Sequence, residues 1–204
     1  MINPHLLIAS YIRKEAVLSS RIEGTRAGIV DLLIDDLDTP NNHKDGDIKE
    51  VQNYIAALEY GIERLNSLPL SLRLVREIHA RLMEGVRGGN AAPGEFRRSQ
   101  NWIGLAGSTL ADATYVPPPP SEMMDCLGNW EMFLQESGSF PELIQCAILH
   151  AQFEAIHPFL DGNGRIGRLL ITLFLIERGR LSQPLLYLSA YIENGKVGFR
   201  DSVG

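Results

Sequence analysis

The feature that most constrains this chain is a short polar stretch, residues 157–168, that lies between two apolar segments with helical periodicity. Its sequence is His-Pro-Phe-Leu-Asp-Gly-Asn-Gly-Arg-Ile-Gly-Arg. Pro158 lacks a backbone donor and disfavours the α conformation at the preceding residue, so the first helix should end near His157. The glycines that follow permit the positive φ angles of a tight turn, and a second helix should begin at about Ile166. The stretch therefore predicts a helix, a polar loop and a second helix.

The loop combines groups that suit a phosphorylated ligand. The backbone N–H groups of the turn and the positive end of the second helix dipole are directed toward one place. Arg165 and Arg168 are three residues apart, so they are neighbours on the first helical turn. Asp161 adds a carboxylate and His157 adds a titratable imidazole. This set of groups suits a polyphosphate that is bound with a divalent metal ion.

Three other interpretations of the stretch are weaker. Residues 162–167 match the dinucleotide-binding pattern G-x-G-x-x-G, but that pattern requires a preceding strand and an acidic residue about 20 positions later. Here the preceding segment is helical, and residues 183–188 contain no acid. An EF-hand is disfavoured because Thr172 stands where that loop requires a glutamate. A purely structural turn explains the proline and the glycines, but it gives no reason for Asp161, Asn163 and the two arginines to converge.

The stretch resembles the signature of the Fic family, His-Pro-Phe-x-Asp/Glu-Gly-Asn-Gly-Arg-x-x-Arg, and it matches every defined position. Family members are mostly protein adenylyltransferases, which move AMP from ATP to a hydroxyl side chain of a target protein. The resemblance implies an all-α, mainly helical Fic-type bundle with a small β-hairpin flap. It also implies ATP as substrate and Mg²⁺ as the metal ion.

The same resemblance assigns roles within the signature. His157 would act as the general base, and Asp161 would hold Mg²⁺ between two phosphates of the nucleotide. Arg165 would steady the leaving pyrophosphate, and Arg168 would take the γ-phosphate. The nucleotide-binding set that the resemblance implies is Gly162, Asn163, Gly164, Arg165, Gly167 and Arg168.

A second, shorter motif lies at the end of a helix expected at about 5–23. A glutamate in the last turn of a helix opposes the helix dipole, so Glu23 should have a partner elsewhere, such as an arginine. Ser19, Glu23 and Gly24 also match the Fic inhibitory motif, Ser/Thr-x-x-x-Glu-Gly/Asn. In that family the glutamate pairs with the second signature arginine, which is Arg168 in this sequence.

Length and composition indicate one compact unit with a small N-terminal addition. We expect residues 1–45 to form the inhibitory helical segment and residues 46–204 to form the catalytic core, without the winged-helix domain that often follows in similar proteins. Hydrophobic residues make up 45% of the chain, and the formal net charge is −6, which gives no electrostatic basis for binding nucleic acid. No apolar run approaches the length needed to span a bilayer. We therefore expect a cytoplasmic protein that contacts neither membrane nor nucleic acid.

Residues 85–120 differ in character from the rest of the chain. Two segments with the composition of strands, 96–104 and 114–116, predict a β-hairpin. In Fic proteins a hairpin at this place is the flap, whose edge aligns the target, and the resemblance assigns that edge, which faces the nucleotide, to Asn101, Trp102, Ile103 and Gly104. Similar proteins close the adenine pocket with a Tyr-Tyr pair, whereas this chain has Phe199-Arg200 at the corresponding place. The resemblance therefore does not assign the residues that would form the wall of the adenine pocket.

Helical periodicity and caps predict the remaining elements. Further helices are expected at about 26–37, from Asp47 to Asn66, from Ser71, from Ser121, from Pro141 to Ile156, and from Pro184. His79 is expected to be a core or interface histidine. Cys126 and Cys146 lie on apolar faces and form no C-x-x-C motif, which indicates buried thiols in a reducing compartment.

The predicted function is AMP transfer from ATP to a Ser, Thr or Tyr hydroxyl of a target protein, including this protein itself, with autoinhibition by Glu23 through Arg168. One alternative is a Fic-related phosphotransferase, a branch that has a lysine in place of Gly164-Arg165. Another is a non-catalytic nucleotide-sensing regulator, which the acidic charge and the intact His157 disfavour. The sequence does not decide whether the same site also removes AMP from modified proteins. It also does not decide whether the protein forms a homodimer.

Overall fold

The computed structural model describes residues 4–37, 46–86, 92–104, 107, 109–138 and 140–193, with side chains from Leu7 onward. This part of the chain holds seven α-helices, one 3-10 turn and no strand, and residues 188–193 are also helical. The expectation of an all-α fold is therefore confirmed. The elements are α1 (Pro4–Ile22), α2 (Ile29–Leu37), α3 (Gly46–Arg64), α4 (Leu72–Leu82), η1 (Leu110–Asp112), α5 (Pro120–Gln135), α6 (Glu142–Ile156) and α7 (Asn163–Glu177).

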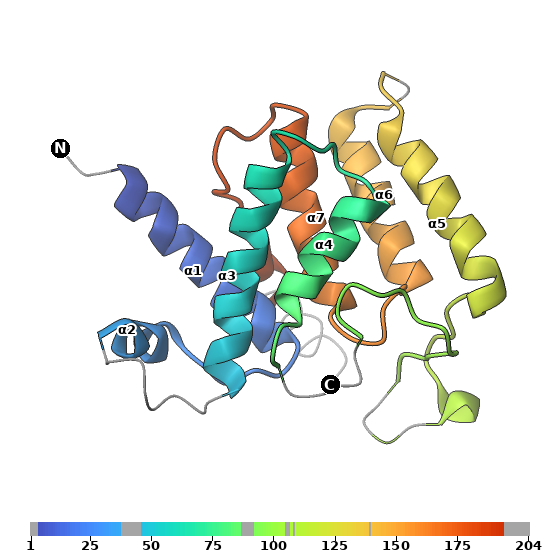
Figure 1. Cartoon of the computed structure of the whole chain (residues 1–204), viewed down its shortest axis with the longest axis horizontal. Coiled ribbons are helices and arrows are strands. Elements are labelled where there is room, and N and C mark those ends of the chain that lie inside the picture. Colours follow the sequence, from blue (N-terminus) through green and yellow to red (C-terminus); the bar gives the residue numbers. More distant parts are fainter. Residues whose placement is uncertain are drawn as a thin grey trace, which may run out of the picture.

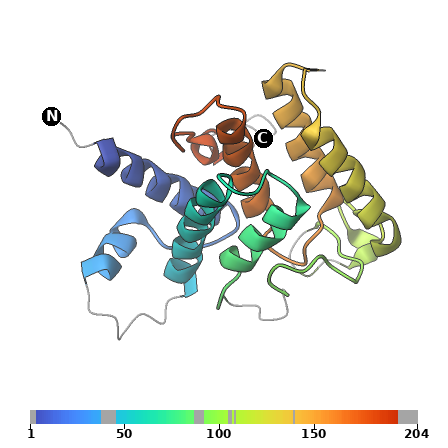
Figure 2. The same cartoon turned by 45° about the horizontal axis from the view of Figure 1, so that its top comes forward.

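Helix α7 is the centre of the bundle. It packs against α1, α3, α4 and α6, and α5 covers α6 (Figure 1). In the tilted view of Figure 2, α1 and α2 lie at one end of the molecule and α5 and α6 lie at the other, with α3, α4 and α7 between them. Eleven of the 15 residues of α7 are buried. Both the polar first turn and the apolar remainder of this helix are therefore enclosed by its neighbours.

The apolar faces predicted from periodicity form the core. Helix α3 buries Val51, Tyr54 and Leu58, and α4 buries Leu74, Ile78 and Leu82. Full burial of one such side chain contributes about 1.5–3 kcal/mol relative to its exposed state. The two faces meet α7 at buried residues that include Leu173. This packing fixes the start of α7 relative to α3 and α4.

The helix ends differ from the expected caps in two places. Ser71 caps α4 as predicted, since its Oγ accepts a hydrogen bond from Leu74 N at 3.4 Å. Ser121 is not a cap: α5 begins at Pro120, because a proline at the first helical position loses only a donor that would have no intrahelical acceptor. Asp47 lies inside the first turn of α3, where its carboxylate instead accepts from Arg26 N at 2.8 Å.

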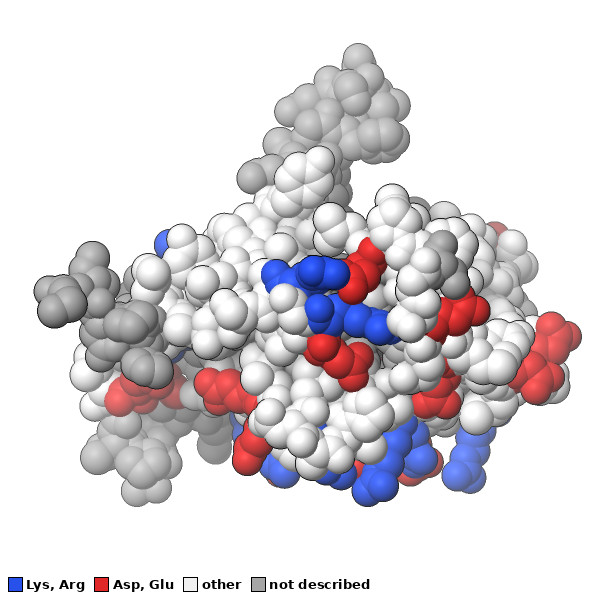
Figure 3. Space-filling model, turned by 90° about the horizontal axis from the view of Figure 1, so that it is seen from above, with Lys and Arg blue, Asp and Glu red and all other residues white. Residues whose placement is uncertain are grey.

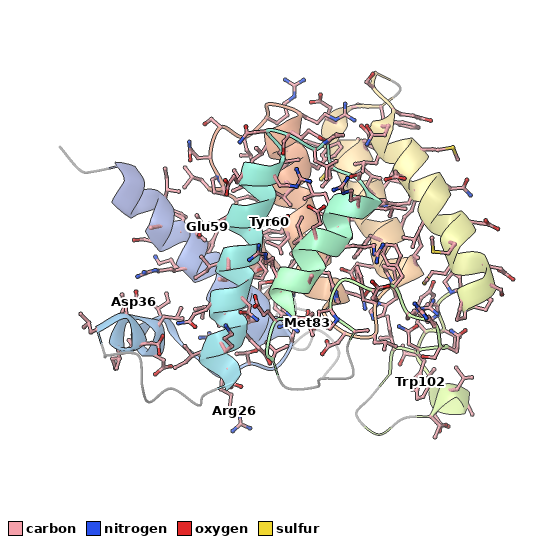
Figure 4. All side chains as sticks on the ribbon, in the orientation of Figure 1. Arg26, Asp36, Glu59, Tyr60, Met83 and Trp102 are labelled. Atoms are coloured by element: carbon pink, nitrogen blue, oxygen red, sulfur yellow. The ribbon has the colours of Figure 1, made fainter. Side chains whose placement is uncertain are left out.

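The expected hairpin is much shorter than its sequence pattern suggested. In the described part of the segment, pairing is confined to one antiparallel bridge, in which Ile103 and Tyr115 exchange hydrogen bonds of 2.9 and 3.0 Å. Preceding residues bond instead to other loops, as when Arg97 N donates to Pro158 O at 2.9 Å. Trp102, labelled in Figure 4, is 41% exposed, and Ile103 is 38% exposed. The flap is therefore a small, partly exposed addition to the helical bundle.

Charged side chains are mixed in sign on the face seen from above. Figure 3 shows Lys and Arg groups that border directly on Asp and Glu groups. Ion pairs on the described surface include Arg64–Glu77 at 2.9 Å and Arg73–Glu77 at 3.0 Å. This face therefore lacks one extended basic area among the residues that the structure describes.

Neither cysteine forms a disulfide, in agreement with the sequence pattern. Cys146 is buried and Cys126 is half-buried. Burial raises the pKa of the Cys146 thiol to about 11, so this residue stays protonated at neutral pH. Among the described helices, none has the length and apolar character needed to cross a bilayer.

Candidate active site

His157 ends α6 in a left-handed backbone conformation, with φ 49° and ψ 60°. Its N–H still donates to Phe153 O at 3.0 Å, so the helix stops at the histidine as predicted. A non-glycine residue in this conformation costs about 1–2 kcal/mol, which surrounding contacts must offset. Burial lowers the pKa of the His157 imidazole. The ring is therefore held in its neutral form, which can accept a proton.

Asn163 closes the loop that follows. Its side-chain oxygen accepts from Phe159 N at 2.9 Å, and its side-chain nitrogen donates to Phe159 O at 2.9 Å. Because this amide is used within the loop, the group that Asn163 can offer to a ligand is its backbone N–H. Helix α7 begins at this residue, three positions before the expected Ile166, because Gly162 adopts a φ of 78° and serves as the cap.

The first turn of α7 presents unused donors. The first backbone hydrogen bond of the helix is from Ile166 N to Gly162 O, at 3.0 Å. The N–H groups of residues 163–165 therefore lack an acceptor within the helix, as is general for the start of a helix. These groups, with the positive end of the dipole, make an anion-binding position.

Arg168 makes the contacts that the inhibitory motif implied. Its Nη2 lies 2.6 Å from Glu23 Oε1 and donates to Ser19 O at 3.0 Å, and its Nε donates to Ser19 Oγ at 2.7 Å. The arginine is 7% exposed. Gly24, the third motif position, has a φ of 104° and lies two residues after the end of α1. The structure thus brings Ser19 and Glu23 onto the second signature arginine.

Glu23 also lies directly over the start of α7. A Cβ atom at Gly164 would overlap Glu23 Oε1 and would lie 3.2 Å from Arg168 Nη1. The missing side chain of Gly164 therefore makes room for a carboxylate at this turn. A phosphate oxygen that approached the same backbone would meet this carboxylate.

Arg165 is buried and faces acidic groups. Its Nη1 lies 3.3 Å from Glu50 Oε2, and its Nη2 lies 3.8 Å from Asp161 Oδ1. Glu50, on α3, also accepts from Thr25 Oγ1 at 2.8 Å. The sequence did not predict Glu50, because its position within an amphipathic helix carries no local signal of a partner 115 residues away.

His79 links α4 to the loop. It is fully buried, as predicted, and its ring stacks on Phe159 with centroids 3.7 Å apart. Its Nδ1 accepts from Gly94 N at 2.8 Å, so Nε2 carries the proton and donates to Asp161 O at 3.1 Å. Burial lowers the pKa of His79 to about 4, which keeps this neutral form at physiological pH. The contact fixes the backbone beneath the Asp161 carboxylate.

Two flap residues hold the carbonyl of His157. Arg97, which is 3% exposed, donates to His157 O at 3.0 Å, and Asn101 donates to the same oxygen at 3.3 Å. The resemblance assigned Asn101 to the nucleotide-facing edge of the flap, and its side chain bonds to backbone oxygens of the signature loop. Sequence reasoning did not single out Arg97, because its partners are backbone carbonyls that leave no mark in the sequence.

Gly167, the remaining glycine of the predicted nucleotide-binding set, has a structural role in helix packing. Gly167 lies against α6, where a Cβ atom would overlap Glu154 Oε1 and would lie 3.1 Å from the His150 ring. Its absent side chain therefore allows α6 and α7 to approach closely. Phe199 and Arg200 lie outside the described residues.

The loop offers one candidate ligand for a metal ion. Among the described residues, no three His, Cys, Asp or Glu side chains gather as a metal site. Magnesium in nucleotide sites usually needs only one or two carboxylates, because phosphates and water supply the other ligands. The Asp161 side chain is 57% exposed, with Oδ1 bonded to Gly162 N at 2.6 Å. This carboxylate fits a magnesium ion that is shared with a nucleotide.

The fold and site define a class of helical bundles in which a histidine and a glycine-rich loop lead into a buried central helix. The chain belongs to the Fic/DOC family. The Fic/DOC family model matches residues 69–175, and the model of the family's N-terminal region matches residues 1–63.

The most similar relatives include proteins named protein adenylyltransferase Fic. Those from Drosophila grimshawi and Drosophila virilis are each 30% identical to this chain over 145 residues. Each alignment covers 66% of this chain and 27% of the relative, so the chain spans about a quarter of the length of these proteins.

Solved structures show the same fold. A Fic family protein from Desulfovibrio desulfuricans matches with a TM-score of 0.74 and 25% identity, over 95% of this chain and 55% of the other. A Fic-domain signalling protein from Bacteroides thetaiotaomicron matches with a TM-score of 0.70 and 21% identity, over 84% and 64%.

Proposed function

We propose that this chain transfers AMP from ATP to a Ser, Thr or Tyr hydroxyl of a target protein and releases pyrophosphate. The observation that carries the proposal is that His157, at the end of α6, is followed within six residues by the donor-rich first turn of α7, and that two buried arginines lie in the first two turns of that helix. The names of the relatives support AMP as the transferred group. Because the chain matches only about a quarter of each of those proteins, the main support for the proposed activity is the arrangement of residues at this site.

Three groups of this chain act on the reaction. The target hydroxyl oxygen attacks the α-phosphorus, and His157 takes the hydroxyl proton. The bond from the α-phosphorus to the bridging oxygen breaks, and pyrophosphate leaves with Arg165 beside it. The N–H groups of residues 163–165 stabilise the charge that develops on the α-phosphate oxygens. A positioned general base contributes about 10²–10⁴-fold to such a step.

Asp161 is the residue that would hold Mg²⁺ together with the nucleotide. When bound, Mg²⁺ neutralises charge on the phosphates and so favours release of pyrophosphate. His79 would support this carboxylate indirectly, since it donates to the backbone oxygen of Asp161 at 3.1 Å.

Glu23 is proposed to inhibit the reaction. The fork of Arg168 cannot serve both Glu23, 2.6 Å away, and the γ-phosphate of ATP. With Glu23 in place, ATP would bind in a pose unsuited to in-line attack. In this proposal, residues 1–45 form an inhibitory segment, and residues 46–204 form the catalytic core that this segment inhibits.

The flap is proposed as the docking edge for the target. Trp102, Ile103 and Gly104 are exposed beside the single bridge, where an extended target segment could add as a strand. The target is a protein with an accessible hydroxyl, including this chain itself. The two free cysteines suit a reducing, cytoplasmic setting.

Labelled ATP tests the transferred group. The wild-type chain, Glu23→Gly and His157→Ala are incubated with Mg²⁺, a cell lysate and ATP labelled on either the α- or the γ-phosphate. The label due to this chain is the difference between wild type and His157→Ala, because kinases of the lysate also use γ-labelled ATP. We expect this difference with α-labelled ATP only. A difference with γ-labelled ATP would instead show a phosphotransferase, and no difference with either label would remove the histidine from the mechanism.

A further inference from the structure

Arg97 has an unusual environment for a buried cation. It is 3% exposed, and the acceptors of its guanidinium are backbone carbonyls. Its Nε donates to His157 O at 3.0 Å, Nη1 donates to Ser99 O at 3.2 Å, and Nη2 donates to Pro118 O at 2.5 Å and to Ile156 O at 3.4 Å. Burial lowers the pKa of this guanidinium, which reflects the cost of enclosing the charge.

The four carbonyls belong to three parts of the site. Ile156 O and His157 O lie at the C-terminal end of α6, where a cation also complements the helix dipole. Ser99 precedes the flap bridge between Ile103 and Tyr115, and Pro118 follows it. One side chain therefore joins the candidate base to both ends of the flap.

Asn101 and Tyr115 reinforce the same connection. The Asn101 amide donates to His157 O at 3.3 Å and to Phe159 O at 3.0 Å, so it spans Pro158. The Tyr115 hydroxyl donates to Ala155 O at 3.0 Å, close to the end of α6. The flap is thus fastened to the end of α6 by side chains as well as by backbone bonds.

The His157 backbone needs such support. Its left-handed conformation is disfavoured for a residue with a side chain, and apart from glycines only His157 and Ala92 have positive φ angles in the described chain. Within the described part of the chain, the hydrogen-bond contact of the imidazole itself is a long one, to Glu154 O at 3.4 Å. The direction of the ring is therefore set mainly by the backbone, and Arg97 and Asn101 hold that backbone through its carbonyl.

We propose that Arg97, with Asn101, is a positioning residue that holds His157 in its strained conformation and fixes the flap relative to it. This inference rests on the proposed role of His157 as general base. Among the described residues, the hydrogen-bond acceptors of these two side chains lie outside the first turn of α7, so their loss should slow transfer while nucleotide binding is retained.

The chain offers a matched control at the end of another helix. Arg178 Nη2 donates to Leu134 O at 2.8 Å and to Glu136 O at 3.0 Å, so it binds carbonyls at the end of α5. Its hydrogen-bond and ring partners among the described residues are Leu134, Glu136 and Phe174, which lie outside the flap and the signature loop. Arg178→Met should remove helix-end hydrogen bonds of the same kind without affecting the histidine.

The experiment compares Arg97→Met, Asn101→Ala, Arg178→Met and His157→Ala with the parent chain. The rate of AMP incorporation from α-labelled ATP is measured together with the Kd of ATP, in the presence of Mg²⁺. The pH titration of the His157 ring is followed by NMR with labelled histidine, and His157→Ala assigns the signal. Arg97→Lys, which keeps the charge and one donor group, tests partial rescue.

We expect Arg97→Met to lower incorporation by about 10–100-fold, because small misplacement of a reacting group has effects of this size. The Kd of ATP should stay within about twofold of the parent value. Because burial and the Arg97 charge both lower the pKa of the His157 ring, the titration is interpreted in Asn101→Ala, which keeps that charge: there it should move toward the ordinary histidine value as the ring becomes more exposed. Asn101→Ala should act in the same direction, Arg97→Lys should recover part of the rate, and Arg178→Met should keep the parent rate.

An Arg97→Met protein that keeps the parent rate would overturn the inference. If that variant does not fold, Asn101→Ala decides by its rate and its histidine titration. The proposed function is tested separately by His157→Ala: full activity of that variant rejects the histidine as base. Loss of activity in His157→Ala with no effect of Arg97→Met or Asn101→Ala rejects the positioning role alone.

Discussion

Arg168 is the residue at which activity and inhibition are proposed to compete. In this structure its guanidinium is bonded to Ser19 and Glu23, and the Glu23 carboxylate also covers the backbone at Gly164. A charge-assisted hydrogen bond of this kind contributes about 1.5–3 kcal/mol. Since about 1.4 kcal/mol corresponds to a factor of ten, this single contact is sufficient for substantial regulation.

Glu23→Gly should therefore raise the rate of AMP incorporation by about tenfold or more, because Arg168 and the N–H groups of the first turn become available to ATP. Ser19→Ala, which removes one acceptor of Arg168 but leaves the carboxylate in place, should raise it less. Both rates are measured with α-labelled ATP. An unchanged rate for Glu23→Gly, in a protein that His157→Ala still inactivates, would contradict the inhibitory role.

His157 provides a prediction about pH. Burial lowers the pKa of its ring below the ordinary value of 6.5, so the neutral, proton-accepting form persists at lower pH than in an exposed histidine. Activity should be lost only as the pH falls through this lowered pKa. The acid limb of kcat/KM against pH, which reports the free enzyme, should have its midpoint below 6.5 in Glu23→Gly, and a midpoint at or above that value would contradict the burial argument.

At the scale of elements, periodicity predicts the helices well because their apolar faces form the core. The residues on those faces of α3 and α4 are buried as expected, and Ser71 caps α4. Helix α7 begins earlier than periodicity indicates, because the sequence does not show that Gly162 adopts a left-handed conformation and lets Asn163 begin the helix. The hairpin is shorter than predicted, because its residues bond to the signature loop instead of to each other.

The signature and the inhibitory motif are sufficient to locate most of the candidate site from the sequence alone. Glu23, Ser19 and Arg168 meet as the motif implied. The supporting contacts of Arg97, Glu50 and His79 were not predictable in detail, because each joins segments far apart in the chain. The Arg97 and His79 contacts end on backbone atoms, whose positions depend on the completed fold.

Glu77 on α4 joins that helix to α3 and provides a stability test. It accepts from Tyr60, labelled in Figure 4, and from Arg64, each at 2.9 Å. Hydrogen bonding from Arg64 is the main reason why the pKa of Glu77 falls to about 2. Because the folded-state pKa lies below the unfolded one, the carboxylate stabilises the fold above about pH 4.5, and this contribution is lost as the pH falls through about 2.

Glu77→Gln should therefore be less stable than wild type at neutral pH, by about 1 kcal/mol or less because the group is partly exposed. The difference in urea midpoint between the two proteins should shrink as the pH is lowered from about 5 toward 2. A difference that stays constant over this range would show that the charge of Glu77 is not responsible.

At the scale of the whole molecule, hydrogen bonds and an ion pair connect α1 to two other parts of the chain. Ser19 and Glu23 connect its end to α7, and the buried carboxylate of Glu15 connects its middle to residues 188–193. Glu15 accepts from Ser189 N at 3.1 Å and from Ser189 Oγ at 2.5 Å. Burial raises the pKa of Glu15, so these two donors are important in offsetting the cost of enclosing its carboxylate.

Ser189→Ala should lower the free energy of unfolding by about 1–3 kcal/mol, because one donor to a buried carboxylate is lost. Ser20→Ala is the matched control, since Ser20 on α1 is as fully buried as Ser189 but its Oγ has no hydrogen-bond partner among the described residues. Its stability should change little. Equal stability of Ser189→Ala and wild type in urea unfolding would exclude the proposed fastening.

The central claim is that the glycine-rich turn at the start of α7 binds the phosphates of ATP while His157 faces the reacting α-phosphate. A crystal structure of Glu23→Gly with Mg²⁺ and a non-hydrolysable ATP analogue tests this claim most directly. We predict phosphate oxygens on the N–H groups of residues 163–165, the γ-phosphate on Arg168, and the ring of His157 directed at the α-phosphate. Phosphates bound elsewhere, or a histidine ring turned away from them into the interior, would contradict it.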